Sequence, residues 1–101
     1  MVIIAKSALT QFAAQHSATI VPLMEWYDIV SEANWSNVND VKQTFNSADY
    51  VGNERFVFNI KGNRYRLVAS VIFSIRTVYI KFIGTHAEYN KIDVKTITLK
   101  Q

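Results

Sequence analysis

The chain of 101 residues has no cysteine, so it can form neither a disulfide nor a thiolate metal site. It has only two histidines, His16 and His86, which lie far apart in sequence and argue against a dedicated zinc site. Proline occurs once and glycine three times, which is too few for a linker or a low-complexity tract. These absences indicate one globular domain over residues 1–101, a usual size for a single domain.

Long apolar runs are missing as well. The most apolar region, residues 67–83, is interrupted by Arg76 and Lys81, and no stretch reaches the length of a membrane span. Residues 1–6 lack the charged head and the apolar run of a signal peptide. We therefore expect a cytoplasmic protein with no membrane partner, and the lack of cysteine fits a reducing compartment.

Negative charge is scarce in the second half of the chain. Residues 1–54 carry two lysines against six carboxylates, a net charge of −4, whereas residues 55–101 carry nine basic against two acidic side chains, a net charge of +7. A basic half on a small domain is typical of a protein that binds a polyanion or an acidic partner. The alternative is a cationic surface that only keeps the protein soluble.

The first half of the sequence follows helical spacing. Ser7 predicts the N-cap of a helix over residues 8–15. A second helix could begin after Ser17, which would put Pro22 beyond the first turn, or after Thr19, which would keep this proline inside it. The apolar stripes of these two helices comprise Leu9, Phe12 and Ala13, and Leu23, Trp26, Tyr27 and Val30.

Two shorter elements complete this half. Ser36 or Asn37 is expected to cap a third helix whose buried side carries apolar residues, and residues 2–4 could add a short strand to a sheet. The buried side of the third helix comprises Val38, Val41 and Phe45.

After residue 50 the apolar period becomes two, which is typical of strands. One strand covers residues 56–61, and Lys61-Gly62-Asn63 forms a hairpin turn. A long strand over 64–73, a turn at 74–75 and a strand over 77–83 follow. Helices followed by an antiparallel meander predict an α+β domain with the N-terminal helices on one face of a small antiparallel or mixed sheet. The other face would carry Asn59, Lys61, Arg64 and Arg66.

Two motifs suggest chemistry on a phosphodiester. Arg64 and Arg66 lie two positions apart, so on a strand they would share one face. His86, Glu88 and Tyr89 then fall within four residues of one another. Guanidiniums that hold phosphate, together with a group that transfers a proton, are the minimum equipment for cutting RNA without a metal. The alternative for each group is an ordinary solvated or packing residue.

Several segments resemble the HigB toxins of type II toxin–antitoxin systems, within the RelE-like superfamily of ribonucleases. They are Phe58–Ala69, Thr85–Tyr89, Trp35–Phe45 and Ala48–Asn53, and together the likeness covers nearly the whole chain. The resemblance implies a RelE-like fold, entry into the A site of the 30S ribosomal subunit, and cleavage of the mRNA there. It also implies a cognate HigA-type helix-turn-helix antitoxin, a higher-order hetero-oligomer with that antitoxin, and no cofactor.

The resemblance assigns roles to particular residues. Arg66 matches the superfamily arginine that contacts the scissile phosphate, and His86 falls where RelE has a second functional arginine. The two lysines of the preceding RelE strand correspond to Val57 and Asn59 here, so a lysine base is in doubt and Lys61 is the remaining source of positive charge.

A further departure follows the Tyr89 position, where HigB members usually have an aspartate and this chain has Asn90, so no acidic role is placed there. Histidine titrates near neutral pH and can take or give a proton. Cleavage by the ribose 2′-OH needs both an acid and a base, and the second role is open among Tyr89, Glu88, Lys61 and the ribosome. The expected catalytic residues are His86, Arg66, Lys61 and Tyr89, the expected RNA contacts are Arg64, Asn59, Arg76, Lys81 and Glu88, and no metal site is expected.

A different class of function remains open from the sequence. A basic sheet surface with aromatic side chains also suits a non-catalytic RNA-binding or partner-binding module. The two hypotheses differ in product chemistry, because only the nuclease creates new RNA ends.

Overall fold

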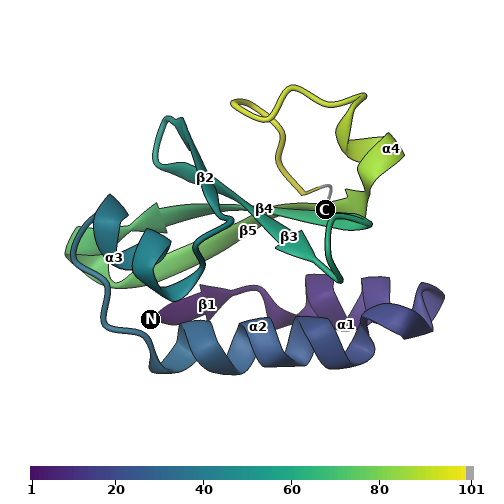
Figure 1. Cartoon of the computed structure of the whole chain (residues 1–101), viewed down its shortest axis with the longest axis horizontal. Coiled ribbons are helices and arrows are strands. Elements are labelled where there is room, and N and C mark those ends of the chain that lie inside the picture. The colour runs from purple at the N-terminus through teal and green to yellow at the C-terminus, as the bar shows by residue number, and fades with distance from the viewer. Residues whose placement is uncertain (100–101) are drawn as a thin grey trace.

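A computed structural model of the chain, which describes residues 1–99, contains one five-stranded sheet with helices packed against one of its faces (Figure 1). The strand order is β1-β5-β4-β3-β2, with β1 parallel to β5 and every other pair antiparallel. This confirms the predicted α+β class and the predicted N-terminal strand. The strands are β1 (Val2–Ile4), β2 (Asp49–Gly52), β3 (Arg55–Ile60), β4 (Tyr65–Ile72) and β5 (Thr77–Thr85).

The helices start close to where capping rules place them, with one exception. The prediction of a Ser7 cap is wrong: α1 begins at Lys6, after Ala5, and no side chain caps it. Thr19 precedes α2, so Pro22 lies in the first turn, as the second alternative predicted. Asn37 caps α3, its side chain accepting a hydrogen bond of 2.9 Å from the Asp40 amide. The helices are α1 (Lys6–Gln15), α2 (Ile20–Glu32), α3 (Val38–Thr44) and α4 (His86–Tyr89), with 3-10 turns η1 (Ser17–Thr19) and η2 (Phe73–Ile75).

The core lies between α1, α2 and the sheet. Trp26 of α2 packs edge-on against Phe58 of β3, with 5.4 Å between ring centroids, and Leu67 of β4 is fully buried beside them. Trp26 and Trp35 are both buried and belong to the core. Within residues 1–99, no helix has the length and apolar character needed to cross a bilayer.

The second face of the sheet is partly covered by residues 90–99, which cross it on the side opposite α1 and α2 (Figure 1). Arg55 fastens this segment, since its guanidinium donates to the carbonyls of Val94 and Ile97 at 3.0 and 2.6 Å. Val57 and Val68 are buried on this face. Asn59 and Arg66 lie on the same face, toward the other end of β3 and β4.

Candidate functional site

The site centres on Arg66, which lies in the middle strand of the uncovered end of the sheet. It pairs with Asn59 of β3 on one side and with Gly84 of β5 on the other. Its guanidinium carbon lies 5.1 Å from the centre of the Tyr89 ring, so an aromatic face supports the cation. Its Nε is buried without a hydrogen-bond partner. An arginine held by a ring and not consumed by internal hydrogen bonds is available to an incoming anion.

Tyr89 reaches Arg66 because α4 turns the chain back immediately after β5. A capping box closes this helix: the Thr85 hydroxyl accepts from the Glu88 amide at 3.1 Å, and the Glu88 carboxylate accepts from the Thr85 amide at 2.8 Å. Glu88 therefore has a structural part in closing the helix cap at Thr85. The predicted contact of Glu88 with RNA stays a prediction.

His86 is the first residue of α4 and lies at the same end of the sheet. Its backbone N–H donates to the Arg64 carbonyl at 2.9 Å, which ties α4 to the hairpin that precedes β4. The ring Nδ1 lies 3.2 Å from the amide nitrogen of Asn90. In this orientation of the amide Nδ1 accepts and Nε2 carries the proton, and a turned amide would reverse the two nitrogens. This contact holds the His86 ring through its Nδ1 and leaves Nε2 free of it.

The β3–β4 hairpin changes the predicted positions of two basic residues. Strand β4 begins at Tyr65, so Arg64 lies in the turn and not beside Arg66 on a strand face, and the expected shared face is wrong. Strand β3 ends at Ile60, and Lys61 is in the left-handed region with φ of +53°, so it does not continue the alternation of the strand. Both side chains are exposed at the hairpin tip.

Arg76 and Lys81 are not brought to this end of the sheet. Arg76 follows η2 at the opposite end of β4 and β5, where its guanidinium bonds the side chain of Asn34. Lys81 is the extra residue of a bulge in β5, and its ammonium lies 5.6 Å from the Tyr79 ring centre. Their proposed RNA contacts remain predictions, at some distance along the strands from Arg66.

Sequence reasoning passed over Gly84. A Cβ at this position would lie 2.5 Å from the ring of Phe82 and 3.0 Å from the Glu88 carboxylate. Because Gly84 has no side chain, the Phe82 ring and the Glu88 carboxylate of the α4 cap can pack directly beside Arg66. A glycine inside a strand pattern is the signal that could have found it, since it often marks a close approach of other groups.

We expect replacement of Thr85 by alanine to lower the free energy of unfolding by about 1 kcal/mol, because the capping hydroxyl is lost. It should lower activity further than this loss of stability explains, since α4 carries His86 and Tyr89. Denaturant unfolding and a cleavage assay measure the two effects.

Thr85→Ser retains a capping oxygen and should restore both properties. Thr10→Ala is a matched control, because that hydroxyl only donates to the Ser7 carbonyl on an exposed helix face. Equal stability of Thr85→Ala and the unmodified chain would contradict the importance of the cap.

The sequence of this chain matches a known protein family and several individual proteins. The family model for HigB toxins, described as the RelE-like toxic component of a toxin–antitoxin system, matches residues 20–92. The chain is 27% identical over 94 residues to the mRNA interferase HigB of Escherichia coli O6:H1, with 91% of each chain covered. It is 29% identical over 93 residues to the mRNA interferase toxin HigB of Escherichia coli K12, with 89% of this chain and 88% of that protein covered. The matched region includes every element of the site, from α2 to α4.

Proposed function

This chain belongs to the HigB family of RelE-like toxins, and from that premise we propose that it is a metal-independent endoribonuclease that cleaves mRNA on the ribosome. The names of its relatives, which are mRNA interferases, support the activity and the substrate class. The observation that carries the proposal is the Arg66 guanidinium, supported by Tyr89 and lacking a partner for Nε, at the end of the sheet where α4 presents His86.

The reaction needs one group that acts as a base and one that acts as an acid, and the group that works beside His86 is a side chain of this protein or part of the ribosome. The ribose 2′-OH attacks the adjacent phosphorus, a bond forms between O2′ and P, and the bond between P and O5′ breaks. The 2′-OH proton passes to a base, and O5′ receives a proton from an acid. The products are a 2′,3′-cyclic phosphate and a 5′-OH end.

Arg66 is proposed to neutralise the charge that builds up on the phosphorane, where a preorganised cation stabilises the transition state more than the ground state. His86 is proposed to exchange a proton with O2′ or O5′, and Tyr89 to hold the guanidinium and a substrate base. Lys61, at the exposed hairpin tip, is proposed to add a second positive charge. The antitoxin is proposed to be of the HigA helix-turn-helix type and to form a higher-order complex.

Mapping of RNA ends tests the proposal. Primer extension on an mRNA incubated with the purified chain, with and without ribosomes, should show new ends only when ribosomes are present. The upstream fragments should resist ligation until the cyclic phosphate is removed. Cleavage should also persist when transition metals are removed by a selective chelator while the magnesium that ribosomes need is kept. RNA binding without new ends would instead identify a non-catalytic binding module.

A further inference from the structure

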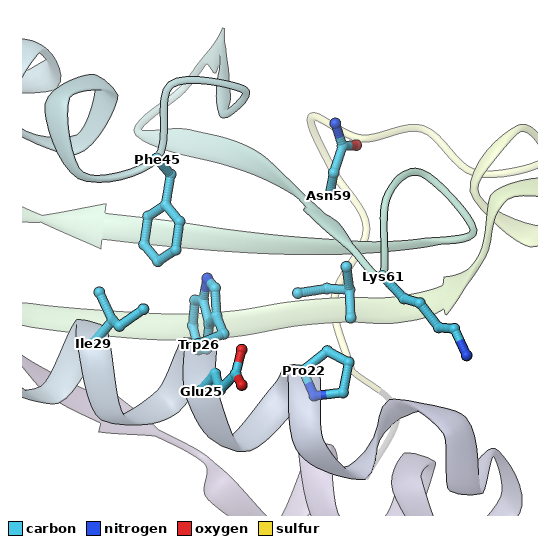
Figure 2. A pocket seen from close by; sticks show the side chains of 8 residues that line it. Pro22, Glu25, Trp26, Ile29, Phe45, Asn59 and Lys61 are labelled. Atoms are coloured by element: carbon cyan, nitrogen blue, oxygen red, sulfur yellow. The ribbon is translucent and has the colours of Figure 1, made fainter.

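A groove lies on the other side of the sheet edge from Arg66, between α2 and the last residues of β3 (Figure 2). Its volume is about 190 Å³. Figure 2 shows Trp26 standing between the helix and the strand, Phe45 above it, and Lys61 pointing away from the groove. The groove is lined by Pro22, Glu25, Trp26, Ile29, Phe45, Asn59, Ile60 and Lys61.

The backbone at the top of this groove is an open sheet edge. Strand β2 pairs with β3 only from Arg55 to Val57. Within residues 1–99, no strand pairs on that side with Phe58–Ile60, although β4 pairs with the same residues on the other side. Phe58 and Ile60 are buried and Asn59 is half-buried, so Asn59 is where this edge is reachable by an extended peptide that adds as a further strand.

Inside the groove wall there is a donor without an acceptor. Trp26 is 2% exposed, and its indole Nε1 has no hydrogen-bond partner. The other tryptophan is satisfied, since Trp35 Nε1 donates to the Thr44 hydroxyl at 2.9 Å. A buried donor without a partner costs stability, so a carbonyl that enters the groove would be favoured there.

The charge and polarity of α2 identify the class of occupant. The helix Ile20–Glu32 carries Glu25, Asp28 and Glu32 at exposed positions and no lysine or arginine. These carboxylates repel RNA phosphates. Ile29 lines the groove and is 45% exposed, so it offers an apolar contact beside Glu25. The surface therefore suits a peptide that carries an apolar side chain next to a basic one.

We propose that this groove, which we call the α2–β3 groove, docks an extended basic and apolar segment of the antitoxin, an inference that rests on the proposed function. The segment adds along Phe58–Ile60, places an apolar side chain against Trp26 and Ile29, gives Trp26 Nε1 a carbonyl acceptor, and pairs a basic side chain with Glu25. Arg66 lies in the middle of the sheet and points to its other face. The docked segment therefore leaves Arg66 uncovered.

Matched lysine substitutions on α2 test the surface. The probe is the purified helix-turn-helix protein encoded beside this chain, and the readout is Kd by calorimetry. Ile29→Lys and Glu25→Lys should each raise Kd by about tenfold or more, since each opposes the basic segment. Val21→Lys should change Kd by less than about twofold, because Val21 is 64% exposed on the same helix and lies outside the groove. Unchanged Kd in both groove variants would overturn the proposal.

The two indoles provide a second, independent readout. In the ¹⁵N spectrum, titration with the same protein should shift the Trp26 indole signal and slow its exchange, whereas the Trp35 signal should stay in place. The proposal would be overturned if the Trp26 indole signal did not shift with the protein, or if it shifted with a single-stranded RNA oligonucleotide instead.

Failure of the groove and failure of the proposed function give different results. Suppose that the Ile29→Lys variant alone cleaves mRNA at the unmodified rate and binds the antitoxin with unchanged Kd. The groove is then not the docking site, and the proposed nuclease function stands. Suppose instead that the unmodified chain does not cleave mRNA but the Trp26 signal shifts on binding. The proposed nuclease function is then wrong, and the groove still docks a basic peptide.

Discussion

Arg66→Ala is expected to lower ribosome-dependent mRNA cleavage by about 10²–10³-fold, the usual cost of removing one group that stabilises a developing anion. The fold should survive, because the side chain makes no internal hydrogen bond through Nε, and its loss removes only the contact with Tyr89. An exposed or half-exposed cation–π contact contributes about 0.5–1 kcal/mol. Single-turnover cleavage and thermal unfolding measured on the same preparation separate the two effects.

Two further variants sharpen this test. Arg66→Lys keeps the charge and loses the planar fork, so it should recover only part of the lost rate. Tyr89→Phe keeps the ring beneath the guanidinium, so Arg66 should stay in place. Any loss of cleavage rate in this variant is then due to the missing phenol hydroxyl. Full toxicity of a well-folded Arg66→Ala chain would remove Arg66 from the site.

His86→Gln is the second large effect: we expect cleavage to fall by about 10²–10⁴-fold, the range for loss of a general acid or base. Glutamine can fill the space but cannot carry a proton between substrate oxygens. The backbone bond from residue 86 to the Arg64 carbonyl does not depend on the side chain, so α4 should stay in place. The other histidine provides the control: His16 stacks on Phe12 with 4.2 Å between centroids, and His16→Gln should cleave at the unmodified rate.

A modified substrate tells the acid from the base. An mRNA with sulfur in place of the bridging O5′ at one cleavage site has a leaving group that needs no proton. If His86 is the acid, His86→Gln should cleave this mRNA nearly as fast as the unmodified chain does. If His86 is the base, the defect should remain. A His86→Gln chain that is fully active on ordinary mRNA would contradict both roles.

Local signals predicted part of the fold. They narrowed the α3 cap to Ser36 or Asn37, left Pro22 inside or beyond the first turn of α2, and predicted the alternation of β3. They placed the cap of α1 wrongly at Ser7. Strand β2 escaped prediction as a strand because it has four residues, ends in a glycine with φ of +84°, and owes its state to pairing with β3. The segment that covers the second sheet face was not predicted either, because Arg55 holds it through carbonyls that lie about forty positions away in the sequence.

The site shows the same limit at the level of side chains. Spacing was enough to associate His86 with Tyr89, because a short helix of four residues holds both. It was not enough for Lys61 and Arg64, where the left-handed turn at Lys61 and Gly62 ends one strand and delays the next. Arg76 and Lys81 are basic like the site residues, so charge alone could not separate them from the site. The end of the sheet that meets α4 is set by the arrangement of all the strands, which the sequence does not reveal locally.

The pairing of β1 with β5 sets the time at which a newly made chain becomes complete. Val2 pairs with Thr77 and Ile4 with Tyr79, so the first strand has no neighbour until nearly the whole chain has been synthesised. At about 5–20 residues per second, translation leaves roughly 4–15 s between the two strands. The five-stranded sheet is therefore unfinished until β5 has been made, and β1 must wait for this strand before it can pair.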